Sequence, residues 1–164
     1  MDAIINAANK IYRHEYVDAI EELKTALKTI PSDNVKENAM AHINLAMAYN
    51  GMQKENPECV ELCNFHSKEA LKYGHNTGLA AERLIINLTK AKKFKNAAEV
   101  CEVVLNGEYK CGEHAYRQKN FFIDKMSKLK TKMEKHKDND LSTENMFTDD
   151  EKRMIIENSN RFKI

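Results

Sequence analysis

The sequence predicts an all-α fold, and two observations support that prediction. Five Gly and two Pro residues occur among the 164, which is few for a sheet protein that must turn often, whereas Ala, Leu, Lys, Glu, Met and Asn are common. Apolar residues also recur at helical spacing along segments that turn residues separate. A chain of this length encloses a core of its own, so we expect a single domain.

Charge and hydropathy narrow the classes of partner and location. The 26 basic and 25 acidic residues nearly cancel, so the net charge gives no general attraction for nucleic acid or for an anionic membrane. No run of about 18 apolar residues predicts a membrane span, and the first residues, with Asp2 and Asn6, lack the pattern of a secretion signal. We therefore expect a cytoplasmic protein whose four cysteines are free thiols.

Two apolar stripes near the N-terminus predict a helical hairpin over residues 2–30. One stripe lies in residues 2–13 and the other in residues 16–30, where Pro31 ends the second helix. Only a short break around His14 separates the two stripes. Helices joined by so short a turn must lie antiparallel.

The same pair recurs twice, over residues 36–73 and 77–106. Asn56 and Pro57 favour the start of a helix, and Gly74 favours its exit. Three successive pairs predict a short helical solenoid. The expected helices are 39–51 and 56–73 in one pair, and 77–91 and 94–105 in the other.

A longer helix is expected over residues 113–136, because apolar residues repeat there at alternating spacings of four and three. We expect it to cover the third hairpin and to end a domain that spans residues 1–136. Residues 137–164 are expected to form a polar, acidic tail, with a linker after Lys137 and a short helix at 148–159. The apolar residues of the long helix are Phe122, Met126, Leu129 and Met133.

Small and bulky residues stand at matching positions in the three pairs, such as Ala19 and Leu23 in the first, Leu45 and Ala46 in the second, and Leu84 and Ala97 in the third. This spacing resembles the tetratricopeptide repeat (TPR). The resemblance covers residues 2–106 and implies three helical hairpins stacked as a right-handed superhelix, with a C-terminal capping helix. An unrelated α-helical bundle is the alternative fold. Repeat separations above the family period of about 34 residues imply longer turns. The matching positions are Ala8, Asn9, Ala19, Leu23, Ala26 and Pro31 in the first pair, Leu45, Ala46 and Tyr49 in the second, and Leu84, Ile85, Leu88, Phe94, Ala97, Cys101 and Val104 in the third.

Residues 41–48, the long turn between repeats and the basic helix after the third pair resemble the TPR domain of immunophilin-type co-chaperones. In such solenoids the first helix of every pair lines a concave groove that binds extended peptides. The resemblance to the co-chaperones implies that this groove holds the C-terminal tail of a chaperone. The groove residues it implies are Ile5, Asn6, Asn9, Ile43, Asn44, Met47, Leu79, Arg83 and Ile86.

In that group a clamp of two lysines, two asparagines and a further cation grips two carboxylates. Asn9, Asn44 and Arg83 match the clamp by position, whereas Ile5 and Leu79 stand where its lysines are expected. Without two of the three cations, the groove favours an apolar segment with one carboxylate against Arg83.

The expected function is therefore protein–protein interaction of the adaptor or co-chaperone type, not catalysis. A bacterial secretion-type chaperone of similar architecture is the alternative. An enzyme with a metal or cofactor in a helical bundle is an alternative of another class. We expect no catalytic constellation, metal or cofactor, because the histidines are scattered and no pair of convergent carboxylates is visible.

Cysteine and histidine spacing raises one metal hypothesis. Cys59, Cys63 and His66 lie at i, i+4 and i+7 of one helix, a spacing that begins a zinc site. Only three ligands are local, and Cys63 and Cys101 stand where the repeat needs small buried residues, so core packing is the favoured reading. Cys111 is expected in a loop.

The segment 117–137 is strongly basic, with eight Lys or Arg residues against Asp124 and Glu134. A basic helix with an apolar stripe is the kind of element that calmodulin or an anionic surface binds. The alternative is a capping helix with a solvated basic face. Residues 138–151 carry six acidic residues and no base, so we expect this acidic stretch to pair with the basic helix within the chain.

Overall fold

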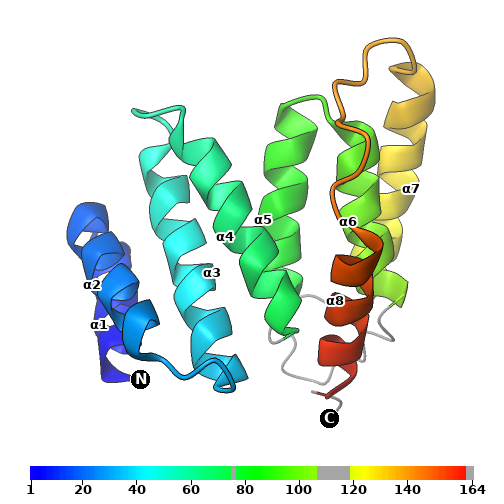
Figure 1. The fold of residues 1–164 in the computed structure, drawn as a ribbon. Helices are drawn as coiled ribbons and strands as arrows, with labels where there is room; N and C mark the ends of the chain where they lie inside the picture. The colour runs from blue at the N-terminus through cyan, green and yellow to red at the C-terminus, as the bar shows by residue number, and fades with distance from the viewer. Residues whose placement is uncertain (75–76, 107–118, 162–164) are drawn as a thin grey trace.

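The computed structural model describes residues 1–74, 77–106 and 119–161, and every regular element in these ranges is a helix. The all-α prediction is therefore confirmed. Figure 1 shows α1 to α7 standing side by side in chain order. No described helix is long and apolar enough to span a lipid bilayer. The helices are α1 (Asp2–Tyr12), α2 (Tyr16–Thr29), α3 (Val35–Met52), α4 (Cys59–Tyr73), α5 (Thr77–Lys90), α6 (Phe94–Asn106), α7 (Lys119–Lys135) and α8 (Asp149–Arg161).

The turns within the first and third hairpins each contain a residue with a positive φ. His14, between α1 and α2, has a φ of 65°, and Lys92, between α5 and α6, has a φ of 58°. The N–H of Glu15 donates to the carbonyl of Lys10 at 2.8 Å. The N–H of Lys93 makes the equivalent bond beyond α5. These left-handed residues satisfy carbonyls at the helix ends and turn the chain back antiparallel.

The second hairpin departs from the predicted bounds at both helix starts. Helix α3 begins directly after Asn34, earlier than predicted, because the Asn34 side chain accepts from the N–H of Glu37 at 3.2 Å and caps the helix. Helix α4 begins later, at Cys59, because Pro57 lies in a turn ahead of it. Gly74 ends α4 with a φ of 73°, the left-handed conformation that glycine adopts without strain.

From α1 to α7, each helix packs against the next, and two further contacts join α1 to α3 and α3 to α5. Two apolar clusters fill the interior. One surrounds Leu23 and Leu45 between the first two hairpins, and the other surrounds Leu84 and Val100 in the third. Helix α7 packs on α6 with Phe122 fully buried. The predicted start of this helix at 113–118, and also His75, Cys111 and His114, lie outside the described residues.

The segment between α7 and α8 is not the linker that was predicted, because α6 holds its backbone. Asn96, which is 1% exposed, accepts from the N–H of Thr143 at 2.9 Å and donates to its carbonyl at 3.1 Å. Glu99 accepts from the N–H groups of Met146 at 2.7 Å and Phe147 at 3.2 Å. Two side chains of α6 therefore supply partners for a backbone that has no helical partner of its own.

Helix α8 packs on α4 and α6, so the C-terminal region is a packed part of the fold. Glu151 forms ion pairs with Lys68 at 3.2 Å and Lys72 at 3.0 Å. Burial raises the pKa of Glu151, but hydrogen bonds from Thr148, Lys72 and Lys68 outweigh burial and lower it to about 2. Asn158 donates to the carbonyl of Lys72 at 2.6 Å. The acidic region is thus anchored on α4, not on the basic helix α7 as expected.

Candidate functional site

The predicted groove residues lie on α1, α3 and α5, the first helices of the three hairpins. Ile5, Asn6 and Asn9 of α1 are exposed, and Ile5 leaves 49% of its surface accessible. Helix α3 packs between α1 and α5, so the accessible side chains belong to one layer of helices. The half-buried members are Asn44, Met47, Leu79, Arg83 and Ile86.

Ile43 does not belong to this surface, and its inclusion in the groove was wrong. Its side chain is 5% exposed and packs with Ala70, Leu71 and Leu84 in the interior. Successive residues of a helix are rotated by about 100° from one another, so Ile43 and its neighbour Asn44 face different directions. Burial of Ile43 leaves the accessible wall more polar at α3 than the sequence suggested.

Arg83 is the predicted cation of the groove, and its guanidinium is incompletely satisfied. The Nε atom of Arg83 is buried and has no hydrogen-bond partner among the described residues. One turn further along α5, Asn87 donates to Asn64 at 2.8 Å and to the Sγ of Cys63 at 3.4 Å, so this face of α5 lies against α4. A buried N–H of a cation without an acceptor carries a cost in stability.

Two histidines that the sequence analysis did not pair lie together between α3 and α4. The Nδ1 atoms of His42 and His66 are 3.0 Å apart, and the ring of Tyr49 stacks on His66 at 5.7 Å between centroids. Burial lowers the pKa of both imidazoles, and that of His66 falls to about 4, with His42 and Lys24 contributing. The histidines are 24 residues apart, so no local motif signals their contact.

The zinc arrangement considered for Cys59, Cys63 and His66 is not assembled. Both cysteines are buried free thiols, and burial raises the pKa of each. His66 directs its ring at His42 instead. Within the described ranges no three His, Cys, Asp or Glu side chains form a group that could hold a metal ion. Cys101 is also buried, and its pKa rises to about 12, so these thiols pack the core.

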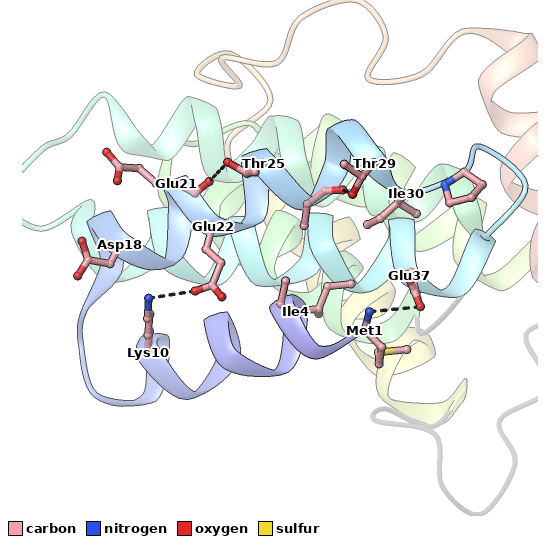
Figure 2. A pocket seen from close by; sticks show the side chains of 13 residues that line it. Met1, Ile4, Lys10, Asp18, Glu21, Glu22, Thr25, Thr29, Ile30 and Glu37 are labelled. Carbon is pink, nitrogen blue, oxygen red and sulfur yellow. Dashed lines mark hydrogen bonds and ion pairs between the residues drawn. The ribbon is translucent and has the colours of Figure 1, made fainter.

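The first hairpin carries an open depression that the sequence analysis missed (Figure 2). It has a volume of about 610 Å³ and lies between α1 and α2, with Ile4 and Ala26 in its wall. Glu22 at its side pairs with Lys10 at 3.0 Å. Its rim also bears Asp18. A run of acidic residues on the outer face of α2 is the only sequence signal for it, and such a run ordinarily marks a solvated face.

Together these features define an all-helical protein with an accessible layer made by α1, α3 and α5. Comparisons of the chain with protein-family models, curated proteins and solved structures found no match. The candidate site therefore rests on the helix packing, on Arg83 and on the accessible side chains around it.

Proposed function

We propose that the protein is a TPR-like helical-repeat scaffold, of the adaptor or co-chaperone type, that binds a peptide segment of a partner protein. The observation that carries the proposal is the packing of α1 on α3 and of α3 on α5. In a stack of helical hairpins, the first helices form one continuous wall, and such walls bind extended peptides. Helix α7, packed on α6, acts in this proposal as the C-terminal cap.

The chemistry of the wall supports an apolar ligand with one carboxylate. Ile5, Met47 and Ile86 offer accessible apolar surface, which favours burial of apolar ligand side chains. Asn9 and Asn44 offer amides to an extended backbone. Arg83 is half-buried and is the one cation among the predicted groove residues, so it offers a positive charge to a carboxylate. A clamp for two carboxylates is less well supported, since Ile5 and Leu79 bring no charge.

The test is selection of peptides with free C-termini from a displayed library, followed by affinity measurement with labelled peptides. Arg83→Gln removes the cation, and we expect it to weaken binding by about 10- to 100-fold, the range for a lost charge-assisted hydrogen bond. Asn44→Ala should weaken the same peptides to a smaller extent. Lys28→Gln, on the exposed face of α2, is the control that also removes one positive charge.

Selected peptides should share apolar residues and one carboxylate, and their binding should weaken with salt. If Arg83→Gln and Lys28→Gln bind the selected peptides equally well, the groove assignment is wrong. Far-ultraviolet circular dichroism of each variant establishes that the helices are retained, so that a loss of binding is attributable to the site.

A further inference from the structure

The fold brings two lysine-rich segments to the same end of the helical row. The turn between α5 and α6 and the last turn of α7 lie together at the upper end in Figure 1. The ring of His136 stacks on Phe94 at 5.2 Å between centroids. The N–H of Leu141 donates to the carbonyl of Lys92 at 2.9 Å. Residues 90–95 and 132–141 therefore form one surface, which we call the lysine end.

The lysine end is strongly positive although the chain as a whole is almost neutral, with a net charge of +1. Seven lysines stand there against three carboxylates, those of Glu134, Asp138 and Asp140. Asp140 is engaged, because it accepts from the backbone N–H of Lys95 at 3.0 Å. The lysines are Lys90, Lys92, Lys93, Lys95, Lys132, Lys135 and Lys137, all of them exposed except the half-buried Lys93.

The lysine end also contains an exposed apolar side chain. Leu141 is 63% exposed, and its backbone is fixed by the bond to Lys92. Transfer of this exposed leucine side chain from water into apolar surroundings lowers its free energy. An exposed leucine on a lysine-rich surface matches the combination that binds lipid bilayers, where cations meet anionic headgroups and an apolar residue enters the acyl boundary.

The sequence of α7 suggested that its apolar stripe binds calmodulin or an anionic surface. The packing of α7 excludes this mode of binding. An amphipathic helix that lies in a membrane, or inside calmodulin, must present its apolar stripe. In α7 that stripe is occupied, because Phe122 is 0% exposed and Leu129 is 3% exposed against the rest of the fold. The basic end of the helix remains free to act with the α5–α6 turn.

We propose that the lysine end is a docking surface for anionic phospholipid membranes, with Leu141 as its apolar anchor. This function is separate from the peptide groove proposed above and does not depend on it. Lipid is favoured over nucleic acid for two reasons. The segments 90–95 and 132–141 contain lysines and no arginine, whereas arginine is the side chain best suited to bidentate contacts with base edges. Their single aromatic side chain apart from histidine, Phe94, is 5% exposed, so these segments offer no accessible phenylalanine, tyrosine or tryptophan ring for bases to stack on.

The test is co-sedimentation of the full chain with vesicles of phosphatidylcholine, with and without about 30% phosphatidylserine, at about 0.1 M salt. We expect binding only to the anionic vesicles. Each lysine near such a surface strengthens binding by about fivefold, so the triple variant Lys92→Gln, Lys95→Gln, Lys135→Gln should bind about 100-fold more weakly. The matched control is Lys24→Gln, Lys28→Gln, Lys36→Gln, which changes the total charge equally on exposed positions of α2 and α3.

Leu141→Trp gives a direct readout of insertion, because the chain contains no other tryptophan. Its fluorescence should shift to shorter wavelength on anionic vesicles and stay unchanged on neutral ones. Absence of binding to anionic vesicles, equal losses in the two triple variants, or an unshifted Leu141→Trp spectrum would each overturn the proposal. Binding of a labelled single-stranded oligonucleotide without vesicle binding would overturn it in favour of nucleic acid.

Discussion

Acidification from about pH 7.5 to about pH 5 should destabilise the fold, because His42 and His66 face each other in its interior. Folding lowers the pKa of His66 from the ordinary 6.5 to about 4. The unfolded chain therefore binds a proton at this residue over a pH range in which the folded chain does not. Stability from this group is complete above 6.5, falls as the pH decreases, and reaches its full loss near 4.

The size of the effect follows from the two pKa values. With 6.5 in the unfolded chain and about 4 in the folded chain, the loss at about pH 5 is about 2 kcal/mol. His42 adds to it, since burial lowers its pKa as well. The charges that face the pair are Lys24 from α2, which lowers the pKa of His66, and Glu69 from α4, which raises it. Lys72, also on α4, lowers that of His42.

The assay is urea unfolding followed by circular dichroism at several pH values, which gives the free energy of unfolding at each. Two points separate the contribution of the histidines to this pH dependence from that of other groups. Glu151 has a pKa of about 2 in the fold against 4.5 ordinarily, so its contribution is lost mainly below pH 4.5 and adds little at about pH 5. His66→Gln keeps a hydrogen-bonding group beside His42 but removes the buried imidazole, and most of the pH dependence should disappear with it.

Equal stability of the wild type at both pH values would refute this reasoning, because it would mean that His66 titrates alike in the folded and unfolded chains. Retention of the full pH effect in His66→Gln would refute the assignment to this residue. Nuclear magnetic resonance titration of the imidazole protons provides an independent measurement of the folded pKa.

Further substitutions test the C-terminal region and one turn. Asn96→Ala leaves the backbone of Thr143 unpaired and should lower the free energy of unfolding by about 2 kcal/mol, as measured in urea. Glu151→Gln should lower it by about 1 to 2 kcal/mol near neutral pH and by little at about pH 2 and below, since the charge contributes only while ionised and the folded pKa is about 2. Gly74→Ala should destabilise the protein and release α8, because its left-handed φ strains alanine and the added methyl group meets the backbone of Asn158. His14→Gly should stabilise the protein by about 0.5 to 1 kcal/mol, since glycine adopts this positive φ freely.

Three of these substitutions have an outcome that would contradict the reasoning behind them. Unchanged stability of Asn96→Ala would mean that the segment around Thr143 does not contribute to the fold. A Glu151→Gln defect that persists at low pH would point to lost packing instead of lost charge. Destabilisation by His14→Gly would show that contacts of the imidazole stabilise the fold by more than the removal of backbone strain does.

The helices α1 to α6 could be predicted because each one packs against a sequence neighbour. In α5 and α6 the apolar positions, such as Leu84 and Val104, repeat at the helical period and are buried, so local pattern and tertiary contact agree. The start of α3 was predicted too late, because the cap that begins this helix is Asn34, whose side chain accepts from the N–H of Glu37 three residues later. The start of α4 was predicted too early, because proline is common both in turns and at the first position of a helix, and Pro57 lies in a turn.

The C-terminal region and the histidine pair could not be predicted, since distant residues determine both. The segment around Thr143 is polar and aperiodic, and it is held by Asn96, which lies 47 residues earlier. Nothing local reveals that partner. For the proposed groove, the sequence placed the candidate residues on α1, α3 and α5 but did not show the rotation of α3, so it could not separate buried Ile43 from half-buried Asn44.

The bond from Asn158 to Lys72 connects residues 86 positions apart. An array whose helices touch only their neighbours can open one hairpin at a time, starting at either end. Here α8 bridges α4 and α6, so the second and third hairpins are expected to open together in one cooperative step. The hairpin of α1 and α2 stands at the end of the row (Figure 1). Its amides are therefore expected to exchange with solvent deuterium before those of α4 and α6.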